Sequence, residues 1–339
     1  MGLPAHSSLI AVLVAAAAVC ASAAAPAGVY ALSADELDPA LVRIDPATGA
    51  VTRVGAPVGV DWQSAEALSA LDAEAGVFYA ILYHGAPVLI GLDLASGAVV
   101  ANVSLAAEFK AQQFVGVGEF VAAMGGGRLV VGGNAADGSH LVGVLDVATG
   151  AFNKTASIPR TVDDSASCSS VYIPADNSVI FQLAAPGPPV VIVAYVVSLD
   201  TGKVRKSDDD YSTDHNLWTF SWDSAKSRVV GLGLEPNITR SMVSLDPTTL
   251  TMQAQCSEAC WLMEAGDMAA FDVASRTLFW FSQPAGTPIT DDQEPWYLVG
   301  ADVDTCAIKS HAFLGNGTFV IPFALEFYGG AAGTPMFRR

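Results

Sequence analysis

The segment Leu41-Val-Arg-Ile-Asp45-Pro-Ala-Thr-Gly49-Ala-Val51 decides the fold, because similar segments recur along the chain. Clear copies occupy residues 89–99, 142–152 and 196–204, and weaker copies occupy residues 242–250 and 298–306. The aspartates of these copies follow one another at intervals of 48, 53, 54, 46 and 56 residues and are Asp45, Asp93, Asp146, Asp200, Asp246 and Asp302. The chain is therefore built from a repeat of about fifty residues.

Each copy predicts a short strand, a tight turn and a second strand. The Asp that opens the turn can accept hydrogen bonds from backbone N–H groups two or three residues later, and the Gly that closes it tolerates a positive φ. We therefore interpret the turn aspartates as structural residues.

A second pair of strands precedes each copy. The paired runs are rich in β-branched and aromatic residues and occupy residues 67–71 with 77–82, 120–124 with 128–132, 170–173 with 178–183, 218–222 with 228–232, and 268–271 with 277–281. Each unit thus has four antiparallel strands, named A to D in chain order, and tandem units of this size are typical of the blades of a β-propeller. No stretch has a convincing helical period.

The two ends of the chain predict the number of blades. Five complete units cover about residues 62–313, which leaves one inner strand within residues 318–328 and three outer strands within residues 28–54. Together these make a sixth blade that joins both ends of the chain and leaves no open edge in the ring. We expect an all-β, six-bladed propeller that forms a single domain over residues 24–339.

The turn motif and strand order resemble the quinoprotein-like and related bacterial-type propeller repeats. The resemblance is at the level of the fold and implies no activity. Blades of quinoprotein dehydrogenases carry a tryptophan after the turn glycine, whereas this chain has Ala50, Ala98, Ala151 and Lys203 there. Pyrroloquinoline quinone is therefore not implied.

Composition excludes several classes of function. Sixteen Lys and Arg stand against 34 Asp and Glu, which gives a net charge of −18, so we expect neither nucleic acid nor an anionic membrane surface as a partner. With 52% hydrophobic and 15% charged residues, the chain is not disordered. The sequence contains no G-x-S-x-G, no H-E-x-x-H and no phosphate-binding loop, so no motif indicates a particular catalytic reaction.

The N-terminus predicts a secreted protein. Residues 1–23 read as a signal peptide, because the apolar run Leu9–Val19 is too short to span a bilayer and small residues follow it; cleavage after Ala23 or Ala25 fits equally. Four N-glycosylation sequons support this compartment and begin at Asn102, Asn153, Asn237 and Asn316. We therefore expect a secreted glycoprotein.

The cysteines after the signal peptide are even in number, as an oxidising compartment favours. They are Cys168, Cys256, Cys260 and Cys306, and three pairings are open to them. The short separation of Cys256 and Cys260 favours a disulfide between these two. A zinc site would require a second close pair, which the chain lacks.

The longer connections between the predicted strands are strongly acidic. In a propeller the B-to-C loops and the D-to-A links lie on one side, and we place any functional site there. The simplest interpretation of the acids is solvation, but clustered carboxylates can also ligate Ca²⁺ or serve as the acid and base of a hydrolase. The catalytic candidates are Asp163, Asp164, Asp208, Asp209, Asp210, Asp214 and His215. The calcium candidates are Asp208, Asp210, Asp291 and Asp292.

Histidines and tryptophans add weaker candidates. His84, His140 and His215 are expected on or beside these loops, where three imidazoles could bind a metal, and His311 is expected in an outer strand. Four tryptophans near this side could stack on sugars or fill the space between sheets, and they are Trp62, Trp218, Trp261 and Trp296. Packing is the simpler interpretation.

Two hypotheses follow from these patterns. The first is a secreted, glycosylated binding module that recognises an extracellular protein or glycan through its acidic long-loop side. The second is a secreted hydrolase or cyclase-like enzyme that uses loop carboxylates, with calcium as its only candidate cofactor.

Overall fold

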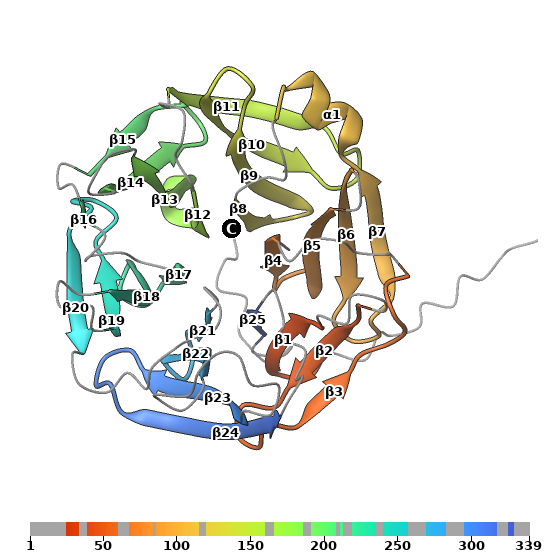
Figure 1. Cartoon of the computed structure of the whole chain (residues 1–339), viewed down its shortest axis with the longest axis vertical. Coiled ribbons are helices and arrows are strands. Elements are labelled where there is room, and N and C mark those ends of the chain that lie inside the picture. Colours follow the sequence, from red (N-terminus) through yellow and green to blue (C-terminus); the bar gives the residue numbers. More distant parts are fainter. Residues whose placement is uncertain are drawn as a thin grey trace, which may run out of the picture.

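The computed structural model is a ring of six β-sheets arranged around a central axis (Figure 1). It describes residues 25–33, 39–59, 68–83, 86–114, 120–159, 166–185, 191–207, 211–212, 219–234, 240–256, 269–282, 295–316 and 325–328. Each sheet contains a row of four antiparallel strands, here named A to D from the inside of the ring outward, and one sheet has a further short strand. The predicted six-bladed β-propeller is confirmed.

Blades 1 to 3 follow the predicted repeat. Blade 1 consists of β4 (Leu68–Asp72), β5 (Val77–Tyr83), β6 (Pro87–Asp93) and β7 (Val99–Ser104). Blade 2 consists of β8 (Phe120–Gly125), β9 (Arg128–Asn134), β10 (Ser139–Asp146) and β11 (Phe152–Pro159). Blade 3 consists of β12 (Ala166–Ile173), β13 (Ser178–Ala185), β14 (Val191–Ser198) and β15 (Val204–Lys206), and the short β16 (Tyr211–Ser212) also pairs with β14.

Blades 4 to 6 complete the ring. Blade 4 consists of β17 (Ser221–Asp223), β18 (Arg228–Leu234), β19 (Arg240–Leu245) and β20 (Met252–Cys256). Blade 5 consists of β21 (Ala269–Asp272), β22 (Thr277–Ser282), β23 (Pro295–Asp302) and β24 (Ile308–Asn316). Blade 6 consists of β25 (Leu325–Tyr328), β1 (Gly28–Leu32), β2 (Leu41–Ile44) and β3 (Val51–Arg53).

Blade 6 is closed by strands from both ends of the chain, as predicted. β25 pairs antiparallel with β1, so that Phe327 lies opposite Val29 and Leu325 lies opposite Ala31. β25 lies within the predicted range, whose residues 318–324 are outside the described residues. Because the last described strand is bonded to the first one, the described strands of the two ends form one continuous sheet.

A hydrophobic cluster fills the seam between every pair of neighbouring blades, so the core of the protein is itself a ring. Alternate residues of one strand belong to two different clusters: Phe78 packs toward blade 6, whereas Tyr79 packs toward blade 2. Phe120 and Phe181 meet in the seam between blades 2 and 3, with ring centroids 4.6 Å apart. This two-sided burial explains why the sequence is so rich in apolar residues.

The connections differ between the two sides of the ring. The A-to-B and C-to-D turns lie on one side, here called the short-turn side, and the B-to-C loops and D-to-A links lie on the other, the long-loop side. One long link contains a helix that the sequence analysis did not expect, α1 (Ala106–Ala111), whose Phe109 is buried against Phe114. In the described part of the chain, no helix is long and apolar enough to cross a membrane.

Two sequence predictions require correction on the short-turn side. The C-to-D turn of blade 3 opens at Ser198 and not at Asp200, because the Gly202 N–H donates to the Ser198 carbonyl in the way that the Gly49 N–H donates to Asp45. Asp200 instead accepts a hydrogen bond from the amide of Asn177.

The second correction concerns the disulfide. Cys256 is bonded to Cys306 and not to Cys260, which lies outside the described residues. Cys256 ends the outer strand of blade 4, and Cys306 lies in the C-to-D turn of blade 5, with 6.0 Å between their Cα atoms. The ring brings together two cysteines one repeat apart, so closeness in the sequence was the wrong guide.

Candidate functional site

The turn aspartates have the structural role that the repeat predicted. Asp45 Oδ1 accepts the N–H groups of Ala47 and Thr48 at 2.9 and 3.1 Å, and Asp246 and Asp302 make the same pair of contacts in their own turns. Hydrogen bonds from the backbone N–H of Ala47 contribute most to holding the pKa of Asp45 below its ordinary value. These carboxylates are therefore occupied in holding the turns.

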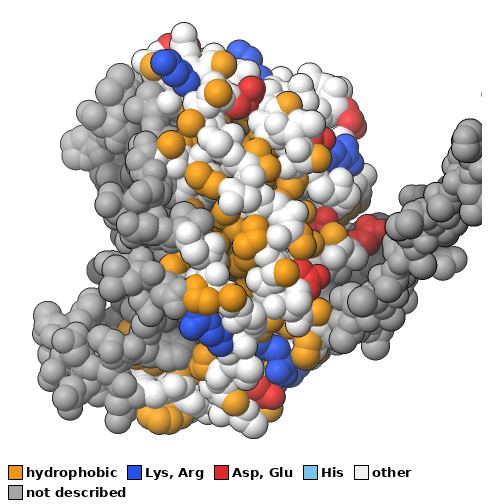
Figure 2. All heavy atoms as spheres, turned by 90° about the vertical axis from the view of Figure 1, so that its right-hand side faces the viewer, with side chains coloured by type: hydrophobic (Ala, Val, Ile, Leu, Met, Phe, Trp, Pro, Cys, Tyr) orange, Lys and Arg blue, Asp and Glu red, His pale blue; other side chains and the backbone are white. Residues whose placement is uncertain are grey.

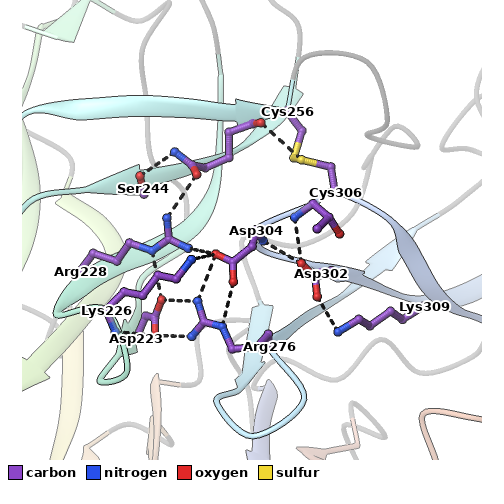
Figure 3. Close-up of polar contacts among 12 residues, drawn as sticks. Asp223, Lys226, Arg228, Ser244, Cys256, Arg276, Asp302, Asp304, Cys306 and Lys309 are labelled. Carbon is purple, nitrogen blue, oxygen red and sulfur yellow. Dashed lines mark hydrogen bonds and ion pairs between the residues drawn. A yellow bond between two sulfur atoms is a disulfide. The ribbon is translucent and has the colours of Figure 1, made fainter.

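The most concentrated polar cluster of the described residues lies on the short-turn side, in the seam between blades 4 and 5 (Figure 3). Asp223, at the end of β17, is fully buried and receives a bidentate contact from Arg276 in the A-to-B turn of blade 5, with Nη2–Oδ2 at 2.6 Å. The Arg228 Nε donates to the same carboxylate at 3.0 Å. Two guanidinium groups thus neutralise one buried carboxylate.

A second carboxylate, which belongs to the C-to-D turn of blade 5, pairs with the same cations. Asp304 Oδ1 accepts from Arg228 Nη2 and from Lys226 Nζ, both at 2.6 Å, and Arg276 Nε donates to Asp304 Oδ2 at 3.1 Å. We call Asp223, Lys226, Arg228, Arg276 and Asp304 the inter-blade ion cluster. It joins the A-to-B turns of two blades to a C-to-D turn, so it fixes one blade against the next.

The pKa values fit this structural role. Burial alone would raise the pKa of Asp223, but hydrogen bonds from Arg276 and Arg228 outweigh it and leave that pKa lowered. The hydrogen bond from Arg276 is the largest cause of the lowered pKa of Asp304, and the bond to Asp223 raises the pKa of Arg276. Carboxylates held ionised by cations are poor general acids and bases at neutral pH. The cluster therefore serves structure and not proton transfer.

This cluster was not predicted from the sequence. Arg276 has φ of 59° at the turn position that Gly76 holds in blade 1, so a long cationic side chain replaces the residue best suited to that backbone. A basic residue at a left-handed turn position, with Lys226 and Arg228 one repeat earlier, was the signal that could have revealed it.

The predicted catalytic and calcium candidates all fall on segments outside the described residues. They are Asp163, Asp164, Asp208, Asp209, Asp210, Asp214, His215, Asp291 and Asp292. His84, Trp62, Trp218 and Trp261 also lie outside them. Among the residues that the structure does describe, no group of three or more His, Cys, Asp or Glu side chains is arranged to hold a metal ion.

His140 lies beside the B-to-C loop of blade 2 and not on it. It lies in β10, is fully buried, and stacks against Phe120 and Phe181 with ring centroids 5.7 and 5.3 Å apart. The B-to-C connection of blade 2 is shorter than expected, since β9 ends at Asn134 and β10 begins at Ser139. The imidazole therefore packs in the seam between blades 2 and 3.

Other predicted positions agree with the structure. His311 lies in the outer strand β24, as expected. Trp296 is buried between blades 5 and 6, which fits packing and not sugar binding. Asn102 and Asn153 are exposed on the outer strands β7 and β11, whereas Asn237 lies outside the described residues.

Comparisons with known proteins agree with the architecture. No protein-family model and no curated protein matches the chain. Among solved structures, TolB from Acinetobacter baumannii has a TM-score of 0.56 and 11% identity, over 90% of this chain and 66% of that one. A protein assigned as TolB from Agrobacterium tumefaciens has a TM-score of 0.51 and 9% identity, over 89% of this chain and 93% of that one.

A protein assigned as a 6-phosphogluconolactonase from Bacteroides fragilis has a TM-score of 0.50 and 8% identity, over 89% of this chain and 98% of that one. The chain is a β-propeller. At identities this low, the similarity extends to the fold and not to an activity or a ligand.

Proposed function

We propose that this protein is a secreted, glycosylated β-propeller that binds a cationic ligand through the acidic loops of its long-loop side. The observation that carries the proposal is the distribution of charge along the chain. Seven segments, here called the acidic segments, are residues 33–40, 58–66, 133–140, 158–168, 207–216, 256–267 and 282–296. They hold 18 of the 34 acidic residues and one of the 16 basic residues.

The strand order indicates on which side of the ring the acidic segments connect the strands. Each acidic segment spans a B-to-C loop or a D-to-A link, in some cases with the ends of the flanking strands, so the strands at both of its ends meet it on the long-loop side. β1 ends at Leu32 and β2 begins at Leu41, for example, and β22 ends at Ser282 before β23 begins at Pro295. Like charges gathered on one side of a protein create a negative potential that attracts and concentrates cations.

The remainder of the chain is nearly balanced in charge, with 16 acidic and 15 basic residues. On the part of the rim seen in Figure 2, acidic and basic side chains are interspersed. On the short-turn side, described carboxylates such as Asp45, Asp223 and Asp304 already accept hydrogen bonds from turns or arginines. These observations favour the long-loop side as the binding surface.

The compartment is supported by separate observations. Residues 1–23 have the pattern of a signal peptide, and the Cys256–Cys306 disulfide is of a kind that persists in oxidising compartments. The sequon asparagines Asn102 and Asn153 are exposed on the rim, where an oligosaccharide can be attached without disturbing the core. A secreted glycoprotein accounts for all of them.

The test compares two variants that change the charge by the same amount on opposite sides. D208N/D210N removes two carboxylates from an acidic segment, and E74Q/D176N removes two exposed carboxylates from the short-turn side. We expect the mature protein to bind a lysine-rich peptide at low salt, D208N/D210N to bind it several-fold more weakly, and E74Q/D176N to bind as the unmodified protein does. Equal weakening by both variants, or no binding by any protein, would overturn the proposal.

A further inference from the structure

An exposed aromatic platform lies on the outer strands of blade 5. The Tyr297 ring in β23 stacks on His311 with centroids 4.5 Å apart and contacts Phe313 with centroids 5.6 Å apart. Phe313 is 50% exposed, whereas the other large exposed hydrophobic side chains of the described residues are valines and an isoleucine. An aromatic ring with half of its surface in water has a face available for a ligand.

A β-bulge in β24 gives Asn316 a register position on the same face of the sheet as this platform. Phe313 lies opposite Tyr297, Gly315 lies opposite Trp296, and Asn316 lies opposite Pro295, with the register shift between Trp296 and Tyr297. Since the three partner residues are consecutive, the backbone positions of Phe313 and Asn316 lie on one face of the sheet, about 7 Å apart along the strand. Without the bulge, a separation of three residues would put them on opposite faces.

Asn316 is also the first residue of a sequon, Asn316-Gly317-Thr318. We propose that the first sugar of an N-linked glycan on Asn316 packs against the ring of Phe313, with Tyr297 and His311 completing the platform. This inference rests on the glycosylation in the proposed function and goes further, because it names one site and its binding surface. The C–H groups on one face of a pyranose ring suit the negative face of an aromatic ring, and the contact removes apolar surface from water.

The other described sequons serve as internal controls. Val99 precedes Asn102 by three residues, and Ile90 lies opposite it across the sheet. Gly150 precedes Asn153 by three residues, and Val144 lies opposite it. Neither sequon has an exposed aromatic ring at the corresponding position, so a glycan there should add no comparable contact.

The experiment uses the full chain secreted from a eukaryotic host, with N-glycans trimmed enzymatically to a single N-acetylglucosamine. Glycopeptide mass spectrometry first establishes which sequons are occupied. Melting temperatures are then compared for the unmodified protein, F313A, N316Q and F313A/N316Q. We expect the sugar on Asn316 to raise the melting temperature by about 1–3 °C when Phe313 is present and by much less in F313A.

A second readout keeps the test independent of any general effect of F313A on stability. The ring protons of the sugar on Asn316 should show upfield NMR shifts from the aromatic ring current, and these shifts should disappear in F313A but persist in N102Q.

The outcomes separate this inference from the proposed function. A glycan on Asn102 or Asn153 with none on Asn316 would overturn the inference alone, as would an occupied Asn316 with additive melting temperatures and no upfield shift. Absence of glycan from all four sequons would overturn both the inference and the glycoprotein part of the proposed function.

Discussion

Cys306 has φ of 65° at a turn position that glycine holds in other blades, and it is bonded to Cys256 of the preceding blade. The glycines at this position are Gly49, Gly97, Gly150 and Gly202, with φ between 68° and 73°. A Cβ placed on any of them would meet the preceding blade, most clearly at Gly97, where it would overlap the Val54 carbonyl oxygen. The side-chain direction at this turn therefore points at the neighbouring blade, and blade 5 uses it for a covalent bond.

Loss of the Cys256–Cys306 bond should destabilise the ring. The disulfide closes a loop of about fifty residues, for which the chain-entropy model gives about 4 kcal/mol. We expect C256A/C306A to lose about 2–4 kcal/mol in the free energy of unfolding, measured by denaturant titration. C260A serves as the control. A non-reduced peptide map that joined Cys256 to Cys260 would contradict the assignment.

Removing the buried carboxylate of the inter-blade ion cluster should be costly. Asp223→Asn removes the buried one of the two carboxylates that pair with Arg276 and Arg228 and leaves Asp304 as their remaining anion, so we expect a loss of about 2–4 kcal/mol in the free energy of unfolding. Lys226→Gln, which changes a half-exposed member of the same cluster, should cost less than about 1 kcal/mol. Similar losses in the two variants would show that burial of Asp223 does not set the energy.

The same cluster and its neighbouring turn predict an acid-sensitive stability. Hydrogen bonds from Lys309 and from backbone N–H groups outweigh burial and lower the pKa of Asp302 to about 2, and the pKa values of Asp223 and Asp304 are also lowered. Carboxylates with lowered pKa values stabilise the folded state above their unfolded pKa near 4, and this contribution is lost as the pH falls toward 2. We expect the melting temperature to decrease between pH 4 and pH 2, and to decrease less in Asp302→Asn. An equal decrease in both proteins would assign the effect to other groups.

A buried amide offers a stabilising substitution. Gln182 in β13 is fully buried in the seam between blades 3 and 4, and neither its amide oxygen nor its nitrogen has a hydrogen-bond partner among the described residues. Because an unsatisfied amide is costly to bury, we expect Gln182→Met to be neutral or to raise the free energy of unfolding by about 1 kcal/mol.

The matched control for that substitution is Gln255→Met. Gln255 accepts from Arg228 at 3.2 Å and donates to Ser244 at 2.9 Å, so its replacement should lower the free energy of unfolding by about 1–3 kcal/mol. A marked loss of stability in Gln182→Met would show that its amide has a polar partner after all.

The fold was predictable because each local signal agreed with the others. Asp45, Asp93 and their equivalents set the repeat, and alternating apolar runs set four strands in each unit, so the strands left over at the two ends had to share a blade. The prediction failed where one blade departs from the pattern. In blade 3 the residue that opens the turn is Ser198. The nearby Asp200 matches the repeat motif in sequence but does not occupy the turn-opening position.

Contacts between blades were harder to predict than the blades themselves. The partner of Cys256 and the cations around Asp223 depend on which turns the ring brings together. This arrangement cannot be deduced from the sequence of one repeat. The separation of Cys256 and Cys306 by one repeat length was the available sign. The predicted carboxylate candidates fall between the strands of the repeat and outside the described residues, and sequence periodicity carries no information about the arrangement of such connections.

The most direct measurement of the central claim is to map where a cationic ligand touches the protein. A lysine-rich peptide bound at low salt can be joined to nearby carboxylates by a zero-length carbodiimide cross-linker and located by peptide sequencing. The account predicts cross-links to acidic residues of the seven acidic segments, Asp208 to Asp210 and Asp291 to Asp292 among them, which decrease as salt is raised. Cross-links concentrated on exposed acids of the short-turn side, such as Glu74 and Asp176, would contradict it.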